Sequence, residues 1–266
     1  MLTFNNKAIK VGSNNVWIHT WKPVGERTVR FRFILRPSDV GSEIPETVTL
    51  AYLQQCQETG GGTGTWTQLS DNVFDWHYDG TDWGGGSNVK TPLGKDTTII
   101  NAQGTKDSFL HYYTFDVVEA DFTGVTSLNY FLHQCRHVNL YSLKHLDSVT
   151  TAVYAFSGHS RQNKENLIHV DDFAMPACTN CSYMLTQQYN LKSVPYITLG
   201  SVEKVTNMFA KTYLVESGAL AMYNQLSSQA IPPAEHTSTF TNCGSGTTTG
   251  AAELAQIPSD WGGTGA

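Results

Sequence analysis

The central part of the chain repeats itself about every 24 residues. Four stretches open on related octets: VTSLNYFL from Val125, VTTAVYAF from Val149, CTNCSYML from Cys178 and VEKVTNMF from Val202. Their starts lie 24, 29 and 24 residues apart, and the longer step holds a polar insertion at 158–166. A fixed period of roughly 20–29 residues is typical of leucine-rich repeats, in which each repeat buries its apolar face against the next. The period therefore predicts a short solenoid, an architecture that usually presents a binding surface.

Within a repeat, the apolar spacing predicts a short helix followed by a short strand. Cys178, Cys181, Met184 and Leu185 stand at i, i+3, i+6 and i+7, which places them on one side of a helix. The second half, clearest at 191–199, has the looser spacing of a short strand. We expect each turn of the array to run helix, bend, strand, bend.

These repeats resemble a known family. The segments CTNCSYML and VEKVTNMFAKT resemble the BspA-type leucine-rich repeats, whose pattern is close to V-T-N-hydrophobic-x-x-M-F-x-x-C and then L-x-x-hydrophobic-P. The best matches are 178–199, which includes Pro195, and 202–212, whereas the second repeat lacks the Met-Phe pair. The C-terminal runs 218–224, 240–244 and 249–263 are similar to the ends of repeat proteins encoded by phages and prophages of gut anaerobes. The resemblance implies the fold of a leucine-rich-repeat array. The family includes bacterial surface adhesins and phage virion proteins.

The flanking parts of the chain differ from the repeats. Residues 28–33 alternate apolar and basic side chains, which predicts a half-buried antiparallel strand. Residues 202–229 lack a following strand and predict a capping helix, and 251–256 predict a short helix with Thr249 as its N-cap. The expected fold class is α+β, with a small antiparallel β domain, a short leucine-rich-repeat solenoid and a helical C-terminal cap. The expected domains are 1–120 (β domain), 121–230 (BspA-type repeats with the capping helix) and 231–266 (C-terminal tail).

Composition excludes several partners. Charged residues make up only 15% of the chain, and the formal net charge is −6. Nucleic acid is therefore not an expected partner, because phosphate binding needs clustered Lys and Arg. No stretch approaches the roughly 18 apolar residues of a membrane span, so we expect no membrane insertion. No signal-peptide pattern opens the chain, which favours a virion protein over an exported adhesin.

Two pairs of residues have spacings that can hold a metal. Cys178 and Cys181 form a CxxC, but both fall on apolar repeat positions, so a buried core role is preferred over a metal or redox site. His133 and His137 lie four residues apart, and no third ligand is evident. We expect no metal and no cofactor.

One segment combines acidic and flat aromatic side chains. Asp75 to Gly84 reads DWHYDGTDWG, a composition found in sugar-binding and calcium sites. The alternative is a core strand followed by a turn anchored by its aromatic residues. The polar insertion adds a histidine and an arginine. The candidate ligand-binding residues are Trp76, Tyr78, Trp83, His159 and Arg161.

The remaining candidate for catalysis is the carboxylate pair Asp171 and Asp172. A glycosidase needs two carboxylates held across a cleft, whereas adjacent residues on a strand point to opposite faces. We therefore predict no catalytic residue.

These observations predict a non-enzymatic phage virion structural protein, attached to tail, baseplate or capsid, that displays a repeat surface for host or protein binding. Its expected partners are other virion proteins or a host surface protein or glycan, and we expect a homo-oligomer. The alternatives are a leucine-rich-repeat adhesin at the bacterial cell surface and, third in order, a glycan-active enzyme.

Overall fold

The computed structural model of the chain describes residues 9–11, 14–16, 27–36, 44–57, 64–84, 93, 98–100, 105–135, 137–158 and 167–266.

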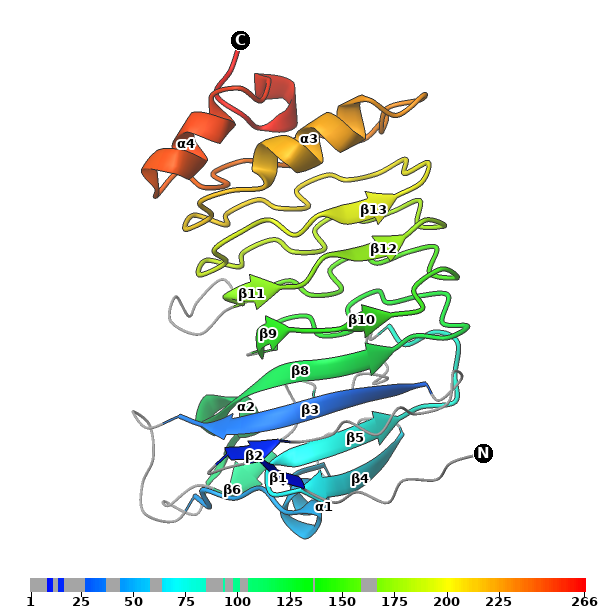
Figure 1. Ribbon diagram of the computed structural model, residues 1–266, viewed down its shortest axis with the longest axis vertical. Coiled ribbons are helices and arrows are strands. Elements are labelled where there is room, and N and C mark those ends of the chain that lie inside the picture. Colours follow the sequence, from blue (N-terminus) through cyan, green and yellow to red (C-terminus); the bar gives the residue numbers. More distant parts are fainter. Residues whose placement is uncertain are drawn as a thin grey trace.

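A seven-stranded mixed sheet dominates the N-terminal half and continues into the repeats (Figure 1). Four neighbouring strands at one side of the sheet are antiparallel, and the remaining strands are parallel to β8 or to β9. In order across the sheet the strands are β4 (Thr65–Ser70), β5 (Val73–His77), β3 (Thr28–Leu35), β8 (Tyr113–Asp121), β9 (His137–Leu140) and β11 (His169–Val170), with β10 (Leu143–Lys144) also paired to β8.

Strand β3 shows why the sheet forms. Val29, Phe31 and Phe33 are buried on one face, whereas Arg30 and Arg32 lie on the other. This is the alternation expected at 28–33, so the predicted antiparallel strand is confirmed.

The opposite face of the sheet carries two buried carboxylates, Asp75 and Asp116, and each is paired with an arginine. Arg30 Nε donates to Asp75 at 2.8 Å, and Arg32 donates to Asp116. Asn139 also donates to Asp116, at 2.8 Å. Because each buried carboxylate is paired, the charged row across β5, β3 and β8, which Asn139 extends to β9 with a neutral amide, contains no isolated buried charge.

Beyond β8 the chain forms five stacked turns. We define these by ten residues each and number their positions 1 to 10; the turns are 125–134, 149–158, 178–187, 202–211 and 233–242. At every junction the amides at positions 4, 6, 8 and 10 donate to the carbonyls at positions 3, 5, 7 and 9 of the next turn. Between the first two turns, for example, Leu128 N donates to Thr151 O at 2.9 Å and Leu132 N to Ala155 O at 2.7 Å. The repeat seen in the sequence is therefore a repeat of backbone hydrogen bonding.

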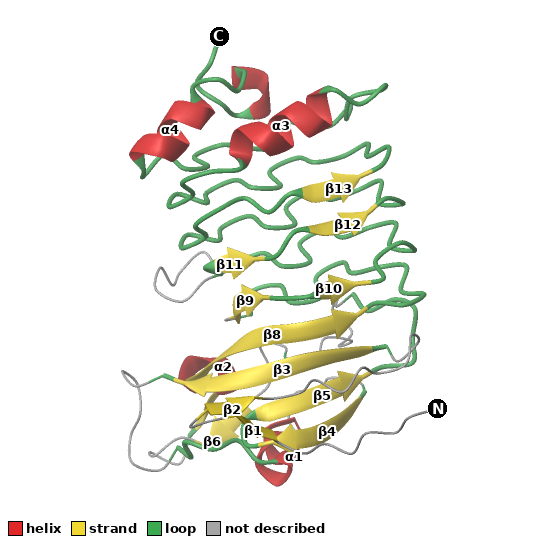
Figure 2. Cartoon of the chain, viewed as in Figure 1, coloured by secondary structure: helices red, strands yellow, loops and turns green. Residues whose placement is uncertain are grey.

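The short helices expected in the repeats do not form. Position 6 has a left-handed backbone in every stacked turn, with φ of 62° at Tyr130 and 55° at Asn207. Four of the five turns repeat this at position 10. A right-handed helix needs φ near −63°, so a left-handed residue in each turn breaks it. The chain bends at these places instead, and most of the stack is drawn as loop in Figure 2.

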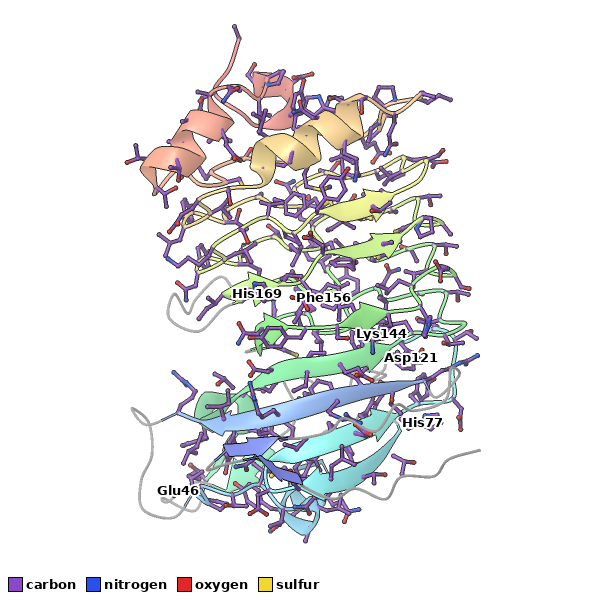
Figure 3. The ribbon with its side chains drawn as sticks, viewed as in Figure 1. Glu46, His77, Asp121, Lys144, Phe156 and His169 are labelled. Carbon is purple, nitrogen blue, oxygen red and sulfur yellow. The ribbon has the colours of Figure 1, made fainter. Side chains whose placement is uncertain are left out.

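The expected architecture is wrong, although the class is broadly α+β, since the chain combines sheets with short helices. The described chain is organised around one seven-stranded mixed sheet, not around a small antiparallel β domain followed by a leucine-rich-repeat solenoid with a helical cap. Strands β9, β10 and β11 come from the repeat region and pair with β8 or with each other, so the sheet crosses the expected boundary. Asp121 and Lys144 lie in register where β8 meets β10 (Figure 3). The division at 120 and 230 stays a prediction.

Helices are short and few among the described residues. Where 202–229 was expected to be one helix, only α3 (Ala219–Ser227) is helical, because 202–211 is a stacked turn. Helix α4 (Thr248–Leu254) begins three residues earlier than expected, and its N-cap is Thr247, not Thr249. The other short elements are β1 (Ile9–Val11), β2 (Asn14–Val16), α1 (Leu50–Gln57), β6 (Thr98–Ile100), β7 (Lys106–Ser108), α2 (Phe109–Tyr112), β12 (Phe173–Met175), β13 (Ile197–Leu199) and the 3-10 helix η2 (Ser259–Trp261).

One hydrophobic core runs through the described chain, from Val29 in the sheet to Trp261 near the C-terminus. Positions 1, 4, 7 and 8 of the first four stacked turns supply its repeat part; in the second turn these are Val149, Ala152, Ala155 and Phe156, all buried. Figures 1 and 2 show α3 and α4 at the end of the stack remote from β4.

Candidate functional site

Two of the candidate ligand-binding residues belong to the core. Trp76 and Trp83 are fully buried, with ring centroids 5.2 Å apart, and both rings contact Phe131. Trp83 Nε1 donates to Gly80 O at 2.7 Å, which anchors the turn that follows β5. Neither indole has a face open to a ligand, so this segment matches the alternative of a core strand with an aromatic-anchored turn.

The other candidates lie elsewhere. Tyr78 is half-buried and stacks on Trp76, with centroids 5.8 Å apart. His159 and Arg161 lie outside the described residues. The side chain of His137, the second histidine of the i, i+4 pair, also lies outside them. His133 Nδ1 lies 2.5 Å from Ser157 Oγ.

Asp171 and Asp172 serve different neighbours. Asp171 accepts from Ser142 N at 3.0 Å and lies 2.8 Å from His169 Nε2, whereas Asp172 accepts from Tyr196 N at 2.7 Å. Burial acts to raise the pKa of Asp171, but the bonds from Ser142 and His169 outweigh it, and the pKa lies below its ordinary value. The two carboxylates therefore bond opposite layers of the stack.

The structure brings together a column of tyrosines that the sequence analysis did not single out. Tyr130, Tyr154 and Tyr183 occupy position 6 of the first three stacked turns. Their rings stack with centroids 5.1 Å apart for the first pair and 4.5 Å for the second, at interplanar angles of 15° and 9°. Tyr130 is 39% exposed and the other two are half-buried. The signal was present in the aligned octets, where the sixth letter is Y in three repeats.

The backbone at this position does not call for tyrosine. Its φ is 62° at Tyr130, 57° at Tyr154 and 60° at Tyr183, a left-handed conformation that is uncommon for bulky residues. Asn207 and Ser238 hold the same position in the last two turns, with φ of 55° and 60°. Asn adopts this conformation more readily, so the tyrosines point to a role beyond the backbone turn.

A second column is made of threonines at position 2. Thr126, Thr150 and Thr179 are exposed, and each hydroxyl donates to a carbonyl one layer below. The acceptors are Thr81 O at 3.4 Å, Thr126 O at 3.1 Å and Thr150 O at 3.4 Å respectively. These bonds fix the rotamers of the exposed hydroxyls.

No Asp, Glu, Lys or Arg occurs in the first three stacked turns, whereas the fourth holds Glu203, Lys204 and Lys211. We call the solvent-accessible residues of the first three turns the uncharged surface. Its members are Thr126, Ser127, Asn129, Tyr130, His133, Gln134, Thr150, Thr151, Val153, Tyr154, Thr179, Asn180, Tyr183 and Gln187.

The chemistry of this surface is hydrogen bonding and aromatic contact. Burial and the neighbouring Tyr183 and Tyr130 raise the pKa of Tyr154, so its hydroxyl keeps its proton and can donate. Antibody binding loops are likewise enriched in Tyr, Ser and Asn, in which rigid aromatic anchors combine with adaptable hydrogen-bonding groups.

The described residues offer neither a group of metal ligands nor a membrane-spanning helix. They contain no group of three His, Cys, Asp or Glu side chains that could hold a metal ion. Nor does any helix among them have the length and apolar character needed to cross a bilayer.

Comparison of the chain with protein-family models, with curated proteins and with solved structures finds no match. The likeness to BspA-type repeats therefore rests on the residues quoted for it and remains a hypothesis.

Proposed function

We propose that this protein is a non-enzymatic structural protein of a phage virion, mounted on tail, baseplate or capsid, and that its uncharged surface binds a host surface molecule or a partner protein. The observation that carries the binding role is the stacked column of Tyr130, Tyr154 and Tyr183.

The tyrosine column is preorganised for binding. The backbone amide of each tyrosine in the column donates to a carbonyl of the next turn. Tyr130 N donates to Val153 O at 2.8 Å, and Tyr154 N donates to Ser182 O at 3.1 Å. The rings are held further by stacking, at a spacing close to the 4.7–4.9 Å between neighbouring strands. Side chains that are already ordered lose little entropy on association, so their contact area adds more to affinity.

Side chains that could perform acid–base chemistry are engaged within the stack. Asp171 and Asp172 accept backbone amides, and His133 bonds Ser157. These structural roles support binding over catalysis. The virion setting is supported by the resemblance of 218–224, 240–244 and 249–263 to the ends of phage-encoded repeat proteins, and a bacterial surface adhesin is the competing setting.

The test is a binding measurement on immobilised full chain with two separate probes, the polysaccharide fraction and the protein fraction of a gut-anaerobe cell envelope. We expect saturable binding of one fraction, weakened at least 10-fold by the double substitution Tyr154→Ala, Tyr183→Ala, because interface tyrosines often contribute more than about 1 kcal/mol each. Tyr213→Ala is the matched control, since Tyr213 stacks on Tyr189 outside the uncharged surface. Equal binding by the double variant and the unchanged protein would refute the assignment of this surface.

The virion setting is tested separately. Antibody raised against the chain should label tail, baseplate or capsid of purified phage particles by electron microscopy, whereas labelling of the bacterial surface alone would favour the adhesin. The expected homo-oligomer is checked by the solution mass from light scattering.

A further inference from the structure

Two cysteine sulfurs lie in contact inside the third stacked turn. Cys178 Sγ and Cys181 Sγ are 3.2 Å apart, and both residues are fully buried. The buried core role expected for this pair is thus confirmed, and neither sulfur is in a disulfide. The sulfurs are adjacent, which makes a bond between them geometrically accessible.

Other turns place aliphatic side chains at these positions. Positions 1 and 4 hold Val149 and Ala152 in the second turn and Val202 and Val205 in the fourth, all buried. A single cysteine there would be an ordinary small hydrophobic residue. Two cysteines in one turn fill the same space and add a chemistry that the neighbouring turns lack.

The two thiols are unequal. The hydrogen bond between the two sulfurs outweighs burial and lowers the pKa of Cys178. The same bond and burial raise the pKa of Cys181 well above its ordinary value. Cys178 is thus the sulfur prepared to become a thiolate, and the thiolate is the reactive form.

The remaining cysteines differ from this pair. Burial raises the pKa to about 12 for Cys56, for Cys135 and for Cys243. All three are buried, so they supply an internal reference for how an unactivated buried thiol in this protein reacts with an oxidant.

We propose that Cys178 and Cys181 form a redox-active dithiol, which a peroxide oxidises reversibly to a disulfide within the third stacked turn. The Cys178 thiolate attacks one peroxide oxygen and breaks the O–O bond, giving a sulfenic acid and, after protonation of the leaving oxygen, water. Cys181 sulfur then attacks the Cys178 sulfur; the S–S bond forms, the S–O bond breaks, and a second water leaves with the Cys181 proton. With hydrogen peroxide, two thiols and one peroxide become one disulfide and two waters.

The turn can accept this bond with a small movement. A disulfide has an S–S length of about 2.05 Å, so the sulfurs must approach by about 1.2 Å. Amides within this segment hold it to both neighbouring turns, through Thr179 N to Thr150 O at 2.9 Å and Cys181 N to Lys204 O at 2.8 Å. Because both sulfurs are buried, the oxidant must wait for local opening, and oxidation should be slow and accelerated by low concentrations of urea.

The experiment uses the full chain and hydrogen peroxide. After oxidation and quenching, the protein is denatured, its remaining thiols are blocked with N-ethylmaleimide, and intact and peptide masses are measured. Of the five cysteines, three should be blocked, and the peptide with Cys178 and Cys181 should be lighter by two hydrogens. Dithiothreitol should restore five blocked thiols. Five blocked thiols after oxidation in low urea, or losses spread over Cys56, Cys135 and Cys243, would overturn the proposal.

Each cysteine can be replaced with the residue that a neighbouring turn has at the same position, so that the variants are expected to fold. Cys178→Val and Cys181→Val copy the side chains at 202 and 205. Each variant keeps four cysteines. In Cys178→Val all four thiols should survive mild oxidation. In Cys181→Val the other three should survive, and Cys178 should remain a thiol or be trapped as a sulfenic acid. Cys243→Ala is the control, and it should still lose two thiols. A disulfide in either valine variant that links Cys178 or Cys181 to another cysteine would also contradict the pairing.

Discussion

The rings of Tyr154 and Tyr183 lie 4.5 Å apart and within 9° of parallel, although 29 residues separate them in the chain. The other neighbouring pair of the column, Tyr130 and Tyr154, is 24 residues apart, so the sequence step between Tyr154 and Tyr183 is five residues longer. The hydrogen bond from Tyr154 N to Ser182 O keeps the register across that step. The stack is therefore set by the ten residues of each turn, and the connection between turns can vary in length.

Replacing a column tyrosine with the residue used elsewhere at position 6 should separate binding from folding. Tyr154→Asn removes the strain of a left-handed tyrosine, which is about 1 kcal/mol or more. It also removes ring stacking that stabilises the fold by about 0.5–1.5 kcal/mol per ring pair, so the two effects oppose each other. We expect the free energy of unfolding, measured in urea, to change by no more than about 1 kcal/mol while binding weakens. A large loss of stability would show that the tyrosines are structural.

Acid should weaken the stack through Asp171. The folded pKa of this carboxyl is below its unfolded value, so its contribution to stability is present above about pH 4 and is lost as the pH falls through the folded pKa. The urea midpoint of the unchanged protein should therefore drop as the pH falls from 5 toward the acid limit of folding. The Asp171→Asn variant should show a smaller drop over the same range. Parallel pH profiles for the two proteins would contradict this assignment.

Gly200 allows two layers to approach. A Cβ on this residue would lie 2.3 Å from Pro176 O, a backbone atom of the preceding layer. Gly200→Ala should therefore lower the free energy of unfolding by about 1–3 kcal/mol, as overpacking does. Ser201→Ala, at the exposed neighbouring residue, is the control and should change the value by less than about 0.5 kcal/mol.

The start of α4 depends on Thr247. Its hydroxyl accepts from Gly250 N at 3.0 Å and donates to Val215 O at 2.6 Å, so it both caps the helix and holds it to the chain before α3. Thr247→Ala should cost about 1–2 kcal/mol in thermal or urea unfolding. Thr249→Ala changes the exposed threonine that the sequence suggested as the cap, and a similar loss in that variant would reverse the assignment.

The register of the stack could be predicted from the sequence because burial repeats with it. Val149, Ala152, Ala155 and Phe156 are buried where the aligned octets place apolar residues. The same spacing, however, fits a short helix and a bent turn equally well. The choice depends on left-handed φ at positions such as Tyr130, which is set by hydrogen bonds to the next turn and has no local signature when the residue is not glycine.

The candidate site needed the folded chain for the same reason. Trp76 and Trp83 have the residue types of a sugar site, but contacts with Phe131, from the first stacked turn, bury them. The tyrosine column shares one letter per repeat, and its rings meet only when successive turns stack. Composition and period determine which side chains recur and which are apolar, because those are local properties of the chain. Long-range hydrogen bonds and packing determine which of them face each other, face the core or face solvent.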